Sequence, residues 1–271
     1  MKTTIFNTVS ILVILIMGAS FTLTSCEKEP EAMALPPKQS LVMDLSVFPG
    51  SNQKAMDPIL SNFAYAGVNV WFWSTAALVH VAVPVAAYKN AFNHVPAYLG
   101  DNSWQWSYTV VVANETYLAE LIGTRLNEEE FSMEMYLSKT TGADLFEDFK
   151  WFEGVVQYDG SAADWKLSYD PFNSTQYLEA AYTKNLSTGE ETLRYTVIDP
   201  QNDIYESYIE YGSVSDAYFD AYFTLNLNDT LTYIEWNTAT DEGRVKNEVD
   251  FDDPGWHCWN SQLQDTDCGS E

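Results

Sequence analysis

The chain has 271 residues, and its 39 Asp and Glu against 13 Lys and Arg give a net charge of −26 at neutral pH. A field of this sign repels phosphate backbones and anionic lipid surfaces, so the composition argues against nucleic-acid binding. Strong acidity is also typical of disordered chains, but 46% hydrophobic and 15% aromatic residues supply enough apolar surface for a folded core.

Residues 1–25 have the pattern of a cleaved secretory signal peptide. Lys2 precedes an apolar run from Val9 to Ala19, and small residues follow it. The run is shorter than the ~20 residues that cross a bilayer, which argues against a retained transmembrane helix. Residues 23–26 (Leu-Thr-Ser-Cys) resemble the lipobox of bacterial lipoproteins. The resemblance implies cleavage before Cys26, acylation of Cys26, palmitate included, and attachment to a membrane through these chains.

Residues 26–39 are then expected to be a lipid anchor and a flexible tether. The acidic start Glu27–Glu31 resembles the export signal that sends Bacteroidota lipoproteins to the cell surface. This resemblance implies an outer-membrane location, on the cell surface rather than the periplasmic face. Residues 40–271 are predicted to form a single β-rich domain, with a first strand from Ser40 to Phe48.

The segment near residues 57–95 predicts a helix or helical hairpin. Asp57 suits the N-cap and Pro58 the first helical position. No residue from Ile59 to Tyr88 carries a formal charge, so we expect burial on most sides. A membrane crossing is the alternative, but Pro84 and several polar residues interrupt the segment, and they favour a buried core helix with a kink or break near Pro84.

From Trp104 onward the hydrophobic period is two, which predicts strands with one buried face. The apolar positions that alternate with polar ones are Trp104, Trp106, Tyr108, Val110 and Val112; Phe131, Met133, Met135 and Leu137; and Phe219, Ala221, Phe223, Leu225 and Leu227. Asp159-Gly160 and Asn228-Asp229 are hairpin signals between such runs. Together the runs predict about ten strands, mostly joined by hairpins.

The expected fold is therefore α+β and mainly β: a curved antiparallel sheet, a meander or half-barrel, around the buried apolar helix. This architecture resembles the half-barrel of periplasmic lipoprotein carriers, without a shared motif. The mature chain also resembles a group of Bacteroidota envelope lipoproteins, and this likeness implies an address and a fold but no activity. It is carried by residues 35–37 (Leu-Pro-Pro), 43–45 (Met-Asp-Leu), 82–87 (Ala-Val-Pro-Val-Ala-Ala), 234–237 (Ile-Glu-Trp-Asn), 243–246 (Gly-Arg-Val-Lys), 256–259 (Trp-His-Cys-Trp) and 267–268 (Asp-Cys).

If a lipid occupies Cys26, two cysteines remain, Cys258 and Cys268 near the C-terminus. In an oxidising compartment this pair predicts a disulfide that pins the tail. A metal or redox pair is the alternative, but the chain has no C-x-x-C and no nearby cluster of ligands.

Motifs that carry enzyme chemistry are missing from the sequence. It has no H-E-x-x-H, no G-x-S-x-G and no Gly-rich phosphate loop, so we assign no catalytic residue, no metal and no cofactor and favour a non-enzymatic role. The three histidines, His80, His94 and His257, are interpreted as structural. The cluster Asp250, Asp252 and Asp253 could hold Ca²⁺, but a solvated acidic loop is the simpler interpretation.

The leading hypothesis is a binding or structural lipoprotein that holds an apolar ligand or a partner segment between sheet and helix near Trp71 and Trp73. The alternative is a surface glycan-binding accessory protein or glycan hydrolase, suggested by 9 Trp and 17 Tyr, with Tyr136, Tyr218 and Tyr222 at polar-facing positions. A third hypothesis is a scaffold that contacts other envelope proteins.

Overall fold

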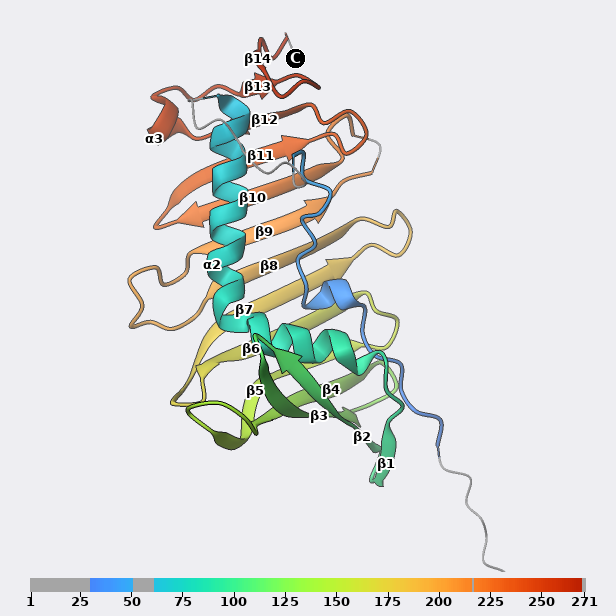
Figure 1. Ribbon diagram of the computed structural model, residues 1–271. Helices are drawn as coiled ribbons and strands as arrows, with labels where there is room; N and C mark the ends of the chain where they lie inside the picture. The colour runs from blue at the N-terminus through green and yellow to red at the C-terminus, as the bar shows by residue number, and fades with distance from the viewer. Residues whose placement is uncertain (1–29, 51–60, 216, 270–271) are drawn as a thin grey trace, which may run out of the picture. The chain divides into compact units, whose positions relative to one another are not determined.

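One antiparallel sheet, in which each strand pairs with its neighbours in the sequence, forms most of the molecule (Figure 1). The structure is a computed structural model that describes residues 30–50, 61–215 and 217–269, without the side chains of residues 76–80. The strands are β1 (Ala97–Gly100), β2 (Ser103–Val112), β3 (Glu115–Arg125), β4 (Glu130–Lys139), β5 (Phe146–Gln157), β6 (Ala162–Asp170), β7 (Asn173–Lys184), β8 (Glu191–Val197), β9 (Tyr208–Ser213), β10 (Ala221–Leu227), β11 (Thr230–Trp236), β12 (Gly243–Lys246), β13 (His257–Trp259) and β14 (Asp265–Thr266). The helices are η1 (Lys38–Ser40), α2 (Asn62–Ala91) and α3 (Glu248–Phe251).

The mainly β, antiparallel prediction is confirmed, but the count of about ten strands is too low. The described residues contain 14 strands, in the order β1 to β14, and the sheet does not close. Several of the strands are very short: β1 and β12 have four residues, β13 has three and β14 has two. Segments of this length are too short to show an alternating pattern, so periodicity cannot detect them.

The predicted alternation is confirmed in the longer strands. On β4, Phe131, Met133, Met135 and Leu137 are buried, while the residues between them are partly exposed. Trp104, Trp106, Tyr108 and Val110 are buried in the same way on β2. We call the face that carries these side chains the inner face, because α2 packs against it.

The Asn228-Asp229 hairpin is also confirmed, and its backbone explains the choice of residues. Leu227 pairs with Thr230, which leaves a two-residue loop between β10 and β11. Asn228 and Asp229 have φ of 48° and 66°, the left-handed values that a type I′ turn requires. Asn and Asp tolerate this conformation better than other residues with a side chain, so these two residues set the register of the hairpin.

Two glycines on the inner face lie directly opposite tryptophans of the neighbouring strand. Gly154 pairs with Trp165, and Gly243 pairs with Trp259. A Cβ added to Gly154 would lie 2.4 Å from Trp165 Cε3, and one added to Gly243 would lie 2.1 Å from Trp259 Cζ2. The indole therefore covers the glycine, and both positions exclude any side chain.

α2 begins later than the sequence predicts. Its N-cap is Ser61, whose Oγ accepts a hydrogen bond from Ala64 N at 3.1 Å. The predicted cap, Asp57 and Pro58, lies outside the described residues. Pro84 lies inside α2 and removes one hydrogen bond of the helical ladder, and Figure 1 shows α2 bent between two segments. α2 approaches β12 and β13 at one end of the sheet and β2, β3, β4 and β6 at the other.

The prediction that α2 is buried on most sides is wrong for its N-terminal half. Val68, Trp71 and Phe72 are 58%, 69% and 49% exposed, and their spacing puts them on one side of the helix. We call these three residues the apolar stripe. The absence of charge means that this segment could be buried on every side, but a single sheet covers only one side of the helix. No helix within the described ranges is both long and apolar enough to cross a membrane.

The chain before α2 does not form the predicted strand at residues 40–48. Met33 is already buried, and Leu41, Met43 and Phe48 join the core. We call residues 33–48 the strap, because this segment crosses the inner face with only one turn of 3-10 helix, η1 (Figure 1).

Side chains of the sheet replace strand pairing for the strap. Tyr195 Oη on β8 donates to the carbonyl of Leu41 at 2.6 Å, and Trp236 Nε1 on β11 donates to the carbonyl of Val47 at 3.1 Å. Buried carbonyl groups need such donors, so these two bonds allow an irregular segment to lie over the core. The spacing of apolar residues in the strap reflects this burial and not a strand.

Candidate functional site

An apolar pocket lies on the inner face over β7 to β10, beneath Trp73 of α2. We call it the Trp73 pocket. It is lined by Trp73, Tyr177, Leu178, Tyr195, Val197, Ile204, Ser207, Tyr208, Ile209, Leu225, Asn226 and Leu227. The strands that α2 approaches most closely lie on either side of this region, and the pocket occupies the stretch between them.

The volume of the Trp73 pocket limits its ligand. It is ≈ 70 Å³, about half of the ~150 Å³ cavity that holds a benzene molecule in another protein. A whole acyl chain does not fit this volume. One apolar side chain, or the end of an alkyl group, is the kind of ligand that does.

The two tryptophans predicted to bind a ligand are separated by the helix. Trp73 lines the pocket, whereas Trp71 belongs to the apolar stripe and faces away from the core. Residues two apart on a helix point about 200° from each other, so both cannot reach one pocket. Trp73 therefore lines the pocket, and Trp71 lies on the outer surface of α2.

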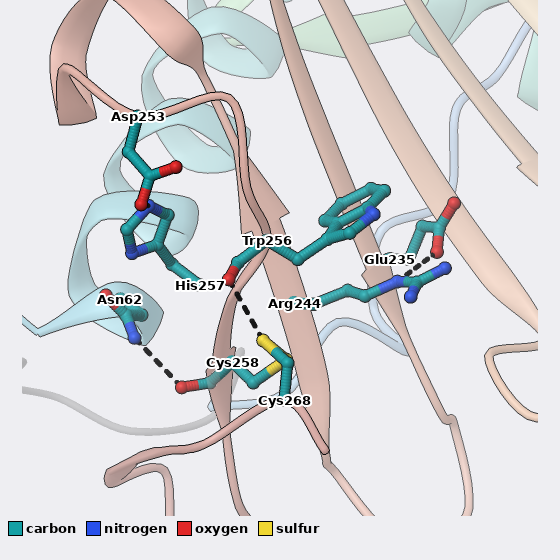
Figure 2. Close-up of a disulfide and its surroundings, with 8 residues drawn as sticks. All are labelled: Asn62, Glu235, Arg244, Asp253, Trp256, His257, Cys258 and Cys268. Carbon is teal, nitrogen blue, oxygen red and sulfur yellow. Dashed lines mark hydrogen bonds and ion pairs between the residues drawn. A yellow bond between two sulfur atoms is a disulfide. The ribbon is translucent and has the colours of Figure 1, made fainter. Parts of the chain in front are cut away.

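The C-terminal tail holds the start of α2 in place. The predicted disulfide between Cys258 and Cys268 is present, with a Cα to Cα distance of 5.1 Å. Asn62 Nδ2 donates to the carbonyl of Cys258 at 2.9 Å (Figure 2), and Asn62 N donates to Asp265 Oδ1 at 2.8 Å. Asp265 thus satisfies one of the free amides of the first helical turn. The disulfide-bonded hairpin fixes the end of the helix that carries Trp73.

Beside the disulfide, Arg244 of β12 packs between aromatic rings. Its guanidinium lies 4.2 Å from the Trp256 ring centre and 4.9 Å from that of Phe219. Arg244 Nε also donates to Glu235 Oε2 at 2.7 Å (Figure 2). The cation–π contacts and the charge-assisted hydrogen bond together hold this side chain, so it contributes to the packing of β11 to β13.

A second pocket lies between the strap and the opposite end of the same strands. We call it the Tyr211 pocket. It has a volume of ≈ 200 Å³ and is lined by Gln39, Val42, Asp44, Val47, Tyr182, Glu191, Thr192, Leu193 and Tyr211. The two pockets share no residue. Sequence reasoning missed this site, because its residues come from the strap, β7, β8 and β9 and no local motif joins them.

In the acidic cluster near the C-terminus, Asp250 and Asp253 accept hydrogen bonds from other groups of the protein. Asp250 accepts hydrogen bonds from Tyr65 Oη and, at 3.2 Å, from Asn247 Nδ2. Asp253 Oδ1 accepts from Gly255 N at 2.7 Å, and Asp252 has a φ of 52° at the end of α3. Within residues 30–50, 61–215 and 217–269, no three His, Cys, Asp or Glu side chains converge as a metal site.

The described histidines pack against aromatic rings. His94 stacks on Tyr108 with ring centres 4.6 Å apart. His257 stacks on Phe251 at 3.9 Å, and its Nε2 lies 3.8 Å from Asp253 Oδ2. The side chain of His80 lies outside the described residues.

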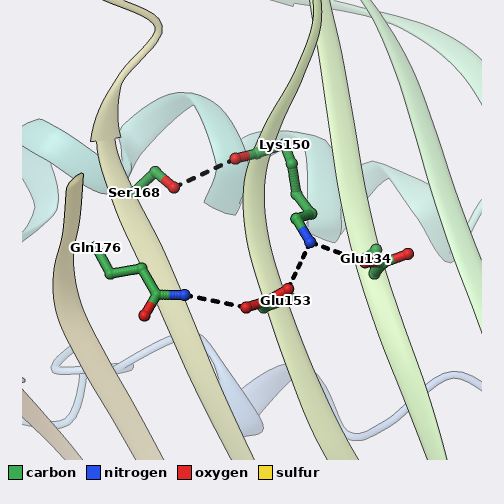
Figure 3. Close-up of polar contacts among 5 residues, drawn as sticks. All are labelled: Glu134, Lys150, Glu153, Ser168 and Gln176. Atoms are coloured by element: carbon green, nitrogen blue, oxygen red, sulfur yellow. Dashed lines mark hydrogen bonds and ion pairs between the residues drawn. The ribbon is translucent and has the colours of Figure 1, made fainter. Parts of the chain in front are cut away.

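A charged cluster on the outer face of β4 and β5 shows why paired carboxylates need not be catalytic. Lys150 Nζ donates to Glu153 Oε2 at 2.6 Å and to Glu134 Oε1 at 3.0 Å (Figure 3). Hydrogen bonds from Lys150 lower the pKa of Glu153, whose Oε1 also accepts from Gln176 Nε2 at 3.0 Å. A glycosidase acid needs a raised pKa, so Glu153 suits an ion pair and not that role.

The three tyrosines named for glycan stacking do not share an environment. Tyr136 and Tyr222 are only partly exposed, and Tyr222 Oη bonds with Thr192 Oγ1 and Glu210 Oε1, each at 3.1 Å. Tyr218 is exposed and donates to Glu242. Two of the three rings thus lack the open face on which a sugar stacks.

No family model, curated protein or solved structure matches this chain. The chemistry of the two pockets therefore rests on their own residues.

Proposed function

We propose that this protein is a lipid-anchored, non-enzymatic binding protein of the bacterial outer envelope, which holds one apolar side chain of a partner protein in the Trp73 pocket. The observation that carries the proposal is an apolar pocket under a helix whose other side presents an unburied apolar stripe, Val68, Trp71 and Phe72. Interfaces of this kind take their affinity from one buried anchor, while neighbouring apolar contacts exclude water.

Hydrogen bonds hold several carboxylates in their charged form. Hydrogen bonds from neighbouring groups lower the pKa values of a set of carboxylates: Asp44, Glu115, Glu153, Asp159 and Glu190. Each of these groups is fully charged at neutral pH. These five groups therefore suit hydrogen bonds and ion pairs, whereas the general acid of a hydrolase needs a pKa raised by burial or by a neighbouring negative charge.

The pocket is tested with a small apolar probe and methyl NMR spectra. Titration with hexan-1-ol is expected to shift the methyl signals of the six aliphatic residues that line the pocket: Leu178, Val197, Ile204, Ile209, Leu225 and Leu227. Trp73→Ala removes the indole that covers the pocket, and the loss of ~50 Å² of apolar contact weakens binding about tenfold.

Trp71→Ala is the matched control, because it removes the same side chain from an exposed position on the same helix. It is expected to leave hexanol binding unchanged. Equal effects of the two substitutions, or shifts that are as large at Leu126 and Val249 as in the pocket, would show that the probe binds the surface non-specifically.

The proposed anchor is tested separately from the pocket. Cys26 lies outside the described residues, and its role is supported by the lipobox-like residues 23–26. Cys26→Ser removes the acylated thiol, so the protein is expected to move from the detergent phase to the aqueous phase in a cloud-point partition after expression in a Gram-negative host. Ser25→Ala keeps a small residue before the cysteine and should stay in the detergent phase. A Cys26→Ser protein that still partitions into detergent disproves the anchor.

A further inference from the structure

We propose that the Tyr211 pocket binds a short alkylammonium group, from either a free amine or a lysine side chain. This site is independent of the Trp73 pocket and of the function proposed for it. The ligand class follows from the polar and apolar groups that line the pocket and from their sources in the fold.

Two carboxylates from different elements line the Tyr211 pocket. Asp44 lies on the strap and Glu191 is the first residue of β8. Hydrogen bonds from Ser46 lower the pKa of Asp44, so it is charged at neutral pH. Burial, followed by the charges of Asp44, Glu191 and Asp220, raises the pKa of Tyr211 to about 12. The hydroxyl of Tyr211 is therefore neutral, and it lies in the field of these carboxylates.

Two lysines interact with the carboxylates of this pocket. Lys184 Nζ is 3.7 Å from Glu191 Oε2, longer than a direct hydrogen bond, and Lys89 acts on Asp44 only through space. Glu191 Oε2 also accepts a hydrogen bond from Tyr182 Oη at 3.0 Å. The hydroxyl of Tyr211 makes no hydrogen bond to the residues that the structure describes, so it is available to a ligand.

The remaining walls select an organic cation over a metal ion. Val42, Val47 and Leu193 are apolar, and Tyr211, whose ring stacks on Trp236 with ring centres 6.1 Å apart, adds an aromatic wall. A metal ion gains nothing from such walls, whereas the methylene groups of an alkylammonium are buried by them. The volume of ≈ 200 Å³ exceeds the ~150 Å³ that holds benzene, so four or so methylene groups fit. The strongly acidic chain raises the local concentration of cations.

Calorimetric titration of the purified protein tests this site. Butylammonium represents a free amine and Nα-acetyl-lysine amide a lysine residue, and at least one is expected to bind with a Kd of about 1 mM. The Nε-acetylated form of the lysine probe is neutral and should not bind. Asp44→Asn and Glu191→Gln each remove a charged acceptor and are expected to weaken binding about tenfold, and Tyr211→Phe about threefold.

Two control variants separate this site from other causes of binding. Asp144→Asn removes one exposed charge from the loop between β4 and β5 and should not change the affinity. Trp73→Ala, which alters the other pocket, should not change it either. The site is disproved if neither amine binds up to about 10 mM, if the Nε-acetylated probe binds as tightly as the amine, or if Asp144→Asn weakens binding as much as Asp44→Asn and Glu191→Gln.

Discussion

Raising the pH from about 8 to about 11 is expected to destabilise the folded protein by at least ~3 kcal/mol. Tyr88 and Tyr195 are 0% and 2% exposed, and burial raises the pKa of both hydroxyls far above 10. In the unfolded chain these groups ionise near pH 10, so above that pH the unfolded state loses protons that the folded state keeps. Each buried tyrosine then costs about 1.4 kcal/mol of stability per pH unit.

The stability is fully present below pH 10 and declines as the pH rises toward the folded pKa values. Tyr65, Tyr117 and Tyr211, with pKa values of about 12, are less buried and add to the loss within the same range. Absorbance at 295 nm reports tyrosine ionisation, and far-ultraviolet circular dichroism reports the sheet. The two signals are expected to change together, because the buried hydroxyls ionise only when the chain unfolds.

Tyr195→Phe is the matched variant for this experiment. It keeps the ring and removes the ionisable group. Above pH 10 the free energy of unfolding should therefore fall less steeply with pH, by the contribution of about one proton. At pH 8 it loses the hydrogen bond to Leu41 O, which costs about 1 kcal/mol. Gradual ionisation of every tyrosine near pH 10 with an unchanged dichroism spectrum would contradict the explanation.

Gly154→Ala is expected to lower the free energy of unfolding by about 3 kcal/mol. The new Cβ would lie 2.4 Å from Trp165 Cε3 and 2.5 Å from the carbonyl oxygen of Asp164. Trp165 has no room to move, because its ring packs against Tyr88 and Phe152 with ring centres 5.8 and 5.4 Å away. The clash must therefore shift the strand backbone of β5 or β6, as in other overpacked cores.

Gly255→Ala provides the control for the glycine substitution. Its Cβ would meet the end of the exposed Asp253 side chain at 3.1 Å, and that carboxylate can rotate away. We expect a change within about 0.5 kcal/mol. Urea unfolding curves measure both variants. If Gly154→Ala lowers the free energy of unfolding no more than Gly255→Ala does, β5 and β6 separate easily. The packing of the indole over the glycine would then have no structural role.

The strands could be predicted because the two faces of the sheet differ in exposure. Phe131 to Leu137 alternate in sequence and in burial alike, and period-two alternation is a local property of the chain. The same method failed for residues 40–48. Leu41 and Met43 are buried at alternate positions, but the donors that satisfy this backbone are Tyr195 and Trp236. No local pattern identifies a donor that lies more than 150 residues away.

The candidate site could be predicted in part. The apolar composition of the helix predicts Trp71 and Trp73 alike as ligand-binding residues, because composition does not distinguish the side that faces the sheet from the side that carries Trp71. That distinction needs the register of α2 on the sheet, which the contact of Asn62 with Cys258 and Asp265 fixes. The Tyr211 pocket could not be predicted, since Asp44 and Tyr211 come together only when the strap covers β9.

The strap contacts strands that come much later in the sequence, and this affects the order in which the contacts of the fold can form. Each strand from β1 to β14 pairs with its neighbours in the sequence, so the sheet can form stepwise along the chain. The strap is made before any strand, yet its partners are made late: Leu41 to Tyr195 spans 154 residues and Val47 to Trp236 spans 189. Until β8 and β11 have formed, the carbonyl groups of Leu41 and Val47 lack these donors, and the strap cannot complete the cover of the inner face. A partly folded chain therefore exposes the tryptophans and methionines of the inner face, and exposed apolar surface of this kind promotes aggregation during folding.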